Sequence, residues 1–288
     1  MPPQTSRPEI ITAVPTGFDA QGAVDPDASR AILEFVAESG NEGAFVLGTT
    51  GEFPALSLEE RGRLTRLALE VLSSRMRVIV HVGAASLFEV LQLIDQAREA
   101  GAREIAVLTP YYLPLTDRAL EDFFRAVDHA SAGLRVYVYV YRKRSNNMVS
   151  PQLMATLASL PNIVGAKVSE EPLSLLEEYR AVVPDDFQIY TGADADVMAV
   201  GDHGAQGVVS GISSVLPKPF RAAAAGEGDA AALQADVDLA ISAIAGDMAR
   251  MHHAYELLGI PSGTCRMAIA EPDAEARALI AEAVQKLG

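Results

Sequence analysis

The stretch GAFVLGTTGEFPALSLEERGRLTRLALEVL (residues 43–72) decides the fold. It begins with a short apolar run and continues through a loop of hydroxyls, glycines and a glutamate. It ends in an amphipathic segment whose residues Leu64, Ala68 and Val71 fall on one helical face. Ser57 and Glu60 stand at the spacing of a capping box at the start of that segment. The pattern predicts a buried strand, a polar loop and a helix.

The same strand–loop–helix unit recurs along the chain. Near-continuous apolar strands separated by helices are typical of a parallel sheet with both faces covered. Eight such units in about 225 residues predict an α/β fold, a (β/α)8 TIM barrel. A doubly wound open sheet is the alternative, but no G-x-G-x-x-G follows the first strand. The other apolar runs are EIITAV (9–14), RVIVHVGA (77–84), REIAVLTPYY (103–112), LRVYVYVY (134–141), NIVGAKVS (162–169), FQIYTGAD (187–194) and AQGVVSGISS (205–214).

The strand pattern stops at AAAAGEGDAA (222–231), and the remainder has the composition of helices. We therefore expect two domains. A catalytic barrel should cover residues 1–225, and a small C-terminal three-helix domain should cover residues 226–288.

Composition narrows the function classes. A formal net charge of −15 argues against a nucleic-acid or anionic-membrane partner. No apolar run reaches the roughly 18 residues of a membrane span, and the start MPPQTSRPEI lacks a signal-peptide core. The single cysteine, Cys265, excludes an internal disulfide and is expected to be a small buried residue. We expect a cytoplasmic protein.

Lys167 is the most unusual residue in the strand pattern. It is one of four lysines and the only one inside a predicted strand, near the carboxyl end where barrels carry their active sites. One interpretation is a buried stem whose ammonium reaches a carboxylate. The other is an amine that burial keeps nucleophilic and that forms a Schiff base with a ketone. Such an iminium withdraws electrons without a metal or organic cofactor, so no cofactor is expected.

Other residues at the strand ends suit this chemistry. Schiff-base formation needs proton transfer, which a tyrosine phenol linked through a threonine hydroxyl can supply. Strand alternation puts Tyr137, Tyr139 and Tyr141 on one face. No metal site is expected, because His252 and His253 are adjacent on a helix and cannot both face one ion.

The motifs GTTGE (48–52), TPYY (109–112), a strand-five tyrosine and GAK (165–167), in this order, resemble the dihydrodipicolinate synthase / N-acetylneuraminate lyase family of class I pyruvate-dependent aldolases. The resemblance implies that Lys167 is the Schiff-base lysine. It implies that Thr49 and Thr50 hold the keto acid's carboxylate and relay protons, with Thr50 taken as catalytic and Thr49 as substrate-binding. Tyr112 would complete the relay from a neighbouring subunit, which implies a homotetramer or homodimer.

The resemblance also selects Tyr139 as the strand-five proton shuttle, with Tyr141 as the alternative. The residues expected to bind substrate, besides Thr49, are Arg144, Val209 and Gly192. The chain departs from the family where Y-N-x-P is usual after that tyrosine, and it has VSEEP (168–172) after the lysine.

The loop VYRKRSNN (140–147) gathers positive charge in an acidic protein. It predicts a substrate with a second acidic group, or a sugar acid held partly by Asn146 and Asn147. The alternative is a solvated basic loop.

The leading hypothesis is a cofactor-free lyase that acts on pyruvate or a 2-keto-3-deoxy acid through Lys167. It would catalyse aldol cleavage, condensation or a related dehydration. The alternatives are dihydrodipicolinate synthase proper, which joins pyruvate and aspartate semialdehyde, and a non-catalytic keto-acid-binding relative.

Overall fold

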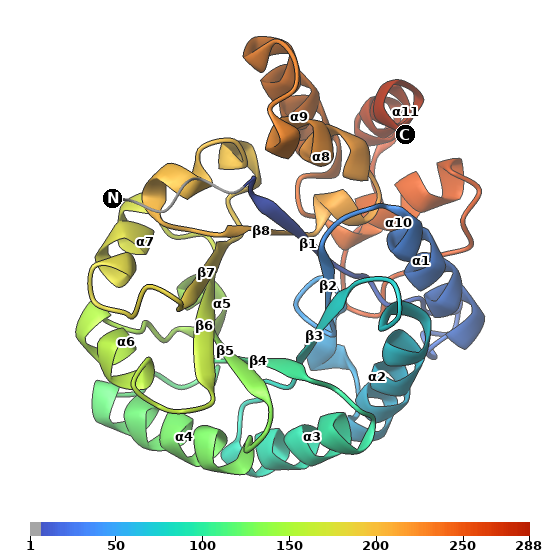
Figure 1. Ribbon diagram of the computed structural model, residues 1–288. Helices are drawn as coiled ribbons and strands as arrows, with labels where there is room; N and C mark the ends of the chain where they lie inside the picture. The colour runs from blue at the N-terminus through green and yellow to red at the C-terminus, as the bar shows by residue number, and fades with distance from the viewer. Residues whose placement is uncertain (1–6) are drawn as a thin grey trace.

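The computed structural model describes residues 7–288. Residues 1–6 of the expected barrel domain, which belong to the stretch MPPQTSRPEI, lie outside the described residues. Eight parallel strands close into a barrel, and helices surround it (Figure 1). The predicted fold class is confirmed. The strands are β1 (Glu9–Ala13), β2 (Gly43–Val46), β3 (Arg77–His81), β4 (Glu104–Leu108), β5 (Arg135–Val140), β6 (Ile163–Val168), β7 (Gln188–Thr191) and β8 (Gly207–Ser210).

Helices follow the strands as the periodicity predicts. The helix α2 begins behind the capping box of Ser57 and Glu60, and α3 begins behind Ser86. The unit after β7 differs, because the Asp- and Gly-rich stretch there forms only two 3₁₀ helices, Asp194–Asp196 and Val200–His203. The barrel helices are α1 (Pro26–Glu38), α2 (Leu58–Leu72), α3 (Leu87–Glu99), α4 (Asp117–Ala130), α5 (Arg142–Ser145), α6 (Pro151–Leu157), α7 (Leu173–Arg180) and α8 (Pro217–Ala225).

The apolar side chains form two cores. One lies between the strands and the surrounding helices, and the other fills the barrel interior. The interior core is rich in aromatic rings, with Phe45, Tyr137, Tyr139 and Tyr190 all buried. Gly165 makes room for them, because a Cβ there would lie 2.6 Å from the Tyr137 ring.

The chain beyond residue 226 forms α9 (Ala230–Ile244), α10 (Met248–Leu257) and α11 (Ala274–Leu287), grouped on one side of the barrel (Figure 1). The helix α10 packs on the barrel, since Tyr255 donates a hydrogen bond to the Ser214 carbonyl and its ring meets Phe35 of α1 edge-on at 5.6 Å. Whether residues 226–288 form a separate domain stays a prediction. Over residues 7–288, none of the helices combines the length and apolar character of a membrane span.

Between α10 and α11 the chain returns to the loop that follows β2. The Arg266 guanidinium donates to both carboxylate oxygens of Glu60 at 2.8 Å and lies 4.6 Å from the Phe18 ring centroid. The Arg266 guanidinium holds the pKa of Glu60 at about 2. This connection fixes the C-terminal segment against the start of α2.

Candidate active site

Lys167 lies inside the barrel near the carboxyl end of β6. Its side chain is 7% exposed, and its Nζ lies 4.1 Å from the ring centroid of Tyr139 and 4.7 Å from that of Phe45. The strand register pairs Lys167 with Tyr139 on β5 and with Tyr190 on β7. Among residues 7–288, no carboxylate oxygen lies within 4.0 Å of Nζ, so the ammonium is not paired as the first interpretation required.

Two hydroxyls meet beside Lys167. The Thr49 Oγ1 lies 3.3 Å from the Tyr139 phenol oxygen. Thr50, the next residue, faces β8 instead, since a Cβ on Gly211 would lie 3.0 Å from the Thr50 hydroxyl. The geometry thus joins Thr49, rather than Thr50, to the strand-five tyrosine.

Tyr137 and Tyr139 of β5 and Tyr141 just beyond it share a face but lie at different depths. The Tyr137 phenol is hydrogen-bonded to Arg77 and Gln188, residues at the amino ends of β3 and β7. The Tyr141 phenol, beyond the end of β5, is hydrogen-bonded to Glu170 and accepts from the Arg144 Nε at 3.3 Å. Tyr139 is the one of the three beside Lys167.

The basic loop carries less net charge than its sequence suggests. Glu170, with a left-handed φ of 54°, pairs with Lys143 at 3.0 Å and with Tyr141. The Tyr141 hydrogen bond and the Lys143 ammonium lower the pKa of Glu170. Arg144 is exposed and lies 5.8 Å from the Tyr141 ring centroid. One acidic and two basic groups therefore stand together at this rim.

Asn147 does not face a substrate, which corrects one sequence-based expectation. It is buried, and its amide donates to the carbonyls of Pro110 and Leu113 at 2.7 and 2.9 Å, while its oxygen accepts from the Leu115 N–H. Asn147 thus shapes the loop that presents Tyr112. Asn146 is exposed with a φ of 63° at the end of α5.

Tyr112 makes little contact with its own chain. Its side chain is 86% exposed and its φ is 83°. A role in the relay needs a second chain, so the expected interface contact stays a prediction.

The remaining predicted residues lie at the ends of β7 and β8. Val209 is buried in the barrel interior, and Gly192 donates its N–H to the Val168 carbonyl at 2.8 Å. Asp194, two residues after Gly192, has a buried Oδ1 without a hydrogen-bond partner among the described residues. Burial raises the pKa of Asp194 to about 7, while Ser210 and Lys167 oppose the shift.

Arg61 and His81 are buried near Tyr139, and neither was predicted to be part of the site. Arg61 is 3% exposed and donates to the carbonyls of Gly83 and His81 at 2.9 and 2.7 Å. The His81 ring lies 5.8 Å from that of Tyr139, and burial together with Arg61 holds its pKa well below the usual range. The sequence contained one indication of a buried arginine here: Arg61 lies three residues before Leu64, on the apolar face of the helix.

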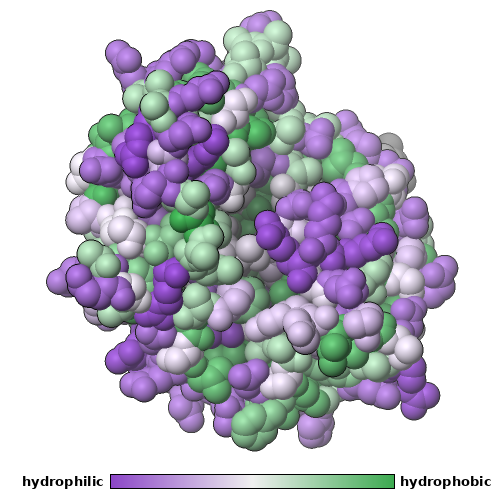
Figure 2. Space-filling view, turned by 180° about the vertical axis from the view of Figure 1, so that it is seen from behind, coloured by the Kyte–Doolittle hydropathy of each residue, from purple (hydrophilic) through white to green (hydrophobic). Residues whose placement is uncertain are grey.

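The face where the strands end is open to solvent. The helix α5, which follows β5, lies behind the barrel in Figure 1, so Figure 2 looks onto this face. It is hollowed near its middle, and hydrophilic residues gather on one rim (Figure 2). Active sites of barrels lie at this face, so a small substrate can reach the ends of the strands from this side.

Comparison with known proteins gives a consistent result. The family model described as the dihydrodipicolinate synthetase family matches residues 7–287. The 4-hydroxy-tetrahydrodipicolinate synthase of Alkaliphilus oremlandii is 34% identical over 209 residues, 73% of this chain and 71% of that protein. Among solved structures, dihydrodipicolinate synthase from Aquifex aeolicus superposes with a TM-score of 0.88 at 26% identity over 97% of each chain. YagE, a prophage protein of that family from E. coli K12 crystallised with pyruvate, gives 0.83 at 26% over 97% of this chain and 98% of its own.

Proposed function

The chain belongs to the dihydrodipicolinate synthetase family of class I aldolase-type lyases, and from this premise we propose that Lys167 forms a Schiff base with pyruvate or a 2-keto-3-deoxy acid. One observation carries the proposal. The Lys167 amine lies inside the barrel against Tyr139, without a carboxylate partner within residues 7–288. The pyruvate bound by the E. coli relative supports the choice of keto acid.

The chemistry follows from these groups. The Lys167 amine adds to the keto carbon, and a proton passes from nitrogen to oxygen through the Tyr139 phenol to give a carbinolamine. Protonation of its hydroxyl releases water and leaves an iminium. In cleavage, electrons of the C3–C4 bond move into that iminium, a base takes the C4 hydroxyl proton, and an aldehyde leaves. The resulting enamine is protonated at C3, and water then releases pyruvate. No metal or organic cofactor is part of this scheme.

The contact between Tyr139 and Thr49 supports an exchange of the two threonine roles. We assign the proton relay to Thr49, because its hydroxyl lies 3.3 Å from the phenol. Thr50, beside Gly211, then binds the carboxylate of the keto acid. Gly192 and Val209 complete the substrate pocket at the ends of β7 and β8.

The reaction partner is proposed to carry an acidic group or several hydroxyls. Arg144 is exposed beside Tyr141 and can grip a carboxylate, whereas Glu170 repels anions and favours hydroxyls at the same rim. Dihydrodipicolinate synthase proper is the second candidate, supported by the name of the 34% identical relative.

We also propose that the protein works in the cytoplasm as a homotetramer or homodimer. The exposed Tyr112 side chain supports a subunit interface at this loop. There it would meet the partner's relay.

Borohydride trapping tests the central proposal. Incubation with pyruvate and borohydride should add one reduced pyruvyl group per chain, read by intact mass. Lys167→Ala should abolish the adduct, and the matched control Lys143→Ala should keep it. An adduct that survives Lys167→Ala at unchanged yield refutes the assignment.

A second experiment tests the reaction partner. Arg144→Ala should raise KM for acidic aldehydes while pyruvate trapping stays at the wild-type level. Arg142→Ala, on the same short helix, is the control and should leave KM unchanged. Equal turnover of neutral and acidic aldehydes by the wild type and by Arg144→Ala would show that the loop is only a solvated surface.

A further inference from the structure

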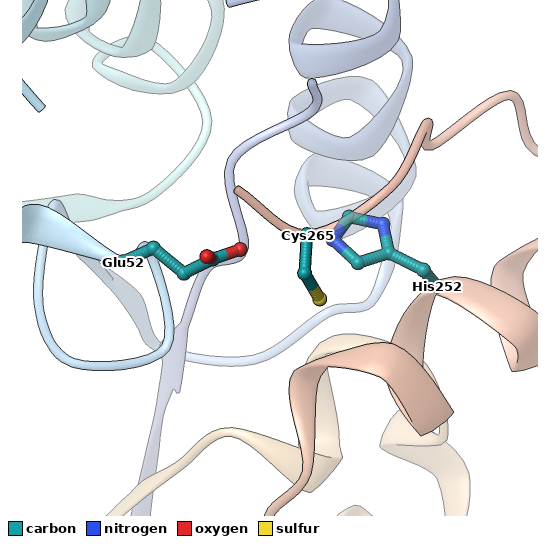
Figure 3. A group of neighbouring side chains, drawn as sticks. All are labelled: Glu52, His252 and Cys265. Atoms are coloured by element: carbon teal, nitrogen blue, oxygen red, sulfur yellow. The ribbon is translucent and has the colours of Figure 1, made fainter. Parts of the chain in front are cut away.

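Three side chains from distant parts of the chain converge beside the substrate loop (Figure 3). Glu52 ends the GTTGE motif after β2, His252 lies in α10, and Cys265 lies between α10 and α11. A carboxylate oxygen, an imidazole nitrogen and the Cys265 sulfur all lie within 4.8 Å of one another. Carboxylate, imidazole and thiolate are the groups that bind Zn²⁺ in proteins.

Glu52 is buried, and only one of its two carboxylate oxygens accepts hydrogen bonds from the described residues. The side chain is 0% exposed, and its Oε2 accepts hydrogen bonds from the backbone N–H groups of Arg266 and Met267 at 3.0 and 2.6 Å. The Oε1 has no hydrogen-bond partner within the described residues. The two N–H groups fix the carboxylate in place, as they do for many metal-binding carboxylates.

His252 is the second unpartnered group. It is 5% exposed, and in the part of the chain that the structure describes neither ring nitrogen makes a hydrogen bond. Its neighbour His253 differs, since its Nδ1 lies 3.2 Å from a Glu256 carboxylate oxygen and 3.1 Å from the Arg277 guanidinium. Buried polar atoms without partners are costly and rare. The unpaired oxygen of Glu52 and the unpaired ring nitrogens of His252, as the described residues leave them, therefore indicate a ligand that binds both side chains.

A cation accounts for the whole cluster better than mutual hydrogen bonds do. The Cys265 thiol is near enough to donate a weak hydrogen bond to the Glu52 carboxylate, but within residues 7–288 neither nitrogen of His252 has a hydrogen-bond partner. A tetrahedral ion with bonds of roughly 2.0–2.3 Å holds its ligand atoms roughly 3.3–3.7 Å apart, which side-chain shifts of about 1 Å would reach from here.

We propose that Glu52, His252 and Cys265 bind a divalent transition-metal ion of the zinc type. We had expected no metal site, and no sequence motif points to this one, because its residues lie far apart in the chain. His252 and Cys265 also line a cavity of about 560 Å³ between α10 and the segment that leads to α11. A fourth ligand, a water or a small anion, can enter the open position from this cavity.

The ion acts as a connector. It ties the loop that carries Thr49 and Thr50 to α10 and to the C-terminal segment. It takes no part in Schiff-base formation, so the site is independent of the proposed function. Metal binding should raise the thermal stability of the protein and leave pyruvate trapping on Lys167 intact.

Cobalt titration of the full chain tests the site. The protein is first treated with a chelator and a phosphine reductant, which keeps Cys265 reduced. We expect the protein to bind one equivalent of Co²⁺ per chain and to show a thiolate-to-cobalt absorption band in the near ultraviolet. Added Zn²⁺ should displace the Co²⁺ and abolish that band. Cys265→Ser should lose the band, and His252→Ala should weaken binding about tenfold or more. His253→Ala is the matched control and should bind as the wild type does.

Thermal unfolding with and without Zn²⁺ gives an independent measurement. Zn²⁺ should raise the Tm of the wild type and of His253→Ala but not that of Cys265→Ser. Far-ultraviolet circular dichroism shows whether each variant is folded. If His252→Ala cannot fold, Cys265→Ser alone decides, because a half-buried Cys265 tolerates serine. The proposal is overturned if the wild type shows no thiolate band, or if Cys265→Ser binds metal as tightly as the wild type.

Discussion

Replacing Tyr139 by phenylalanine should separate catalysis from packing on β5. The ring would keep its edge-on contacts with Phe45 at 5.7 Å and with His81 at 5.8 Å. Within residues 7–288 the phenol makes one hydrogen bond, to Thr49 at 3.3 Å, which is long for a bond between hydroxyls. The loss of folding free energy should therefore be at most about 1 kcal/mol. The catalytic loss should be larger, because kcat should fall by about 10²–10⁴, or about 2.7–5.4 kcal/mol in activation free energy.

The same substitution at the other two tyrosines provides matched controls. Tyr137→Phe leaves Arg77 and Gln188 without their phenol partner, so it should cost about 1–3 kcal/mol of stability and leave kcat nearly unchanged. Tyr141→Phe removes the contact with Glu170 at the rim, so it should change KM for the second substrate more than kcat.

Three measurements distinguish the variants. Steady-state kinetics give kcat and KM, borohydride quenching gives the rate of imine formation, and urea denaturation gives the free energy of unfolding. The reasoning fails if Tyr139→Phe keeps kcat within threefold of the wild type. A hundredfold loss in Tyr141→Phe alone would move the shuttle to Tyr141.

Three further predictions concern stability and its pH dependence. Because the folded pKa of Asp194 is raised to about 7, protons stabilise the folded state between about pH 4 and pH 7. Urea denaturation should show Asp194→Asn gaining on the wild type by up to about 1.4 kcal/mol per pH unit as pH rises through that window. The pKa of Glu60 is lowered to about 2 by Arg266, so the pair stabilises above about pH 4.5 and loses this contribution as pH falls toward 2. Arg266→Ala should therefore lower the Tm at pH 7 and much less at pH 2.5. Gly165→Ala should destabilise the barrel by about 1–3 kcal/mol, because its Cβ would contact the Gln188 carbonyl, and unchanged urea unfolding would contradict this packing.

The sequence contained the information for the barrel in local form. Apolar strands, amphipathic helices and the cap at Ser57 are set by neighbours a few residues apart, so their order could be inferred without coordinates. The prediction of a helix directly after β7 was wrong. The Asp and Gly residues there disfavour an α-helix, and the chain forms two 3₁₀ helices instead. Cys265, expected to be buried, is half-buried because it lies on the return segment beside Glu52.

Some residues of the candidate site could also be identified from the sequence, whereas their contacts could not. Lys167 stood out in the sequence because lysine is rare inside a buried strand, and the motifs pointed to Tyr139, Thr49 and Thr50. Only the tertiary structure brought Thr49 to Tyr139 and gave Asn147 a structural role in the loop before α4. Closure of the barrel and the return of the C-terminal segment also decided that Glu52, His252 and Cys265 would meet. The strands and helices follow from local periodicity, whereas such long-range contacts depend on how the whole chain closes and packs.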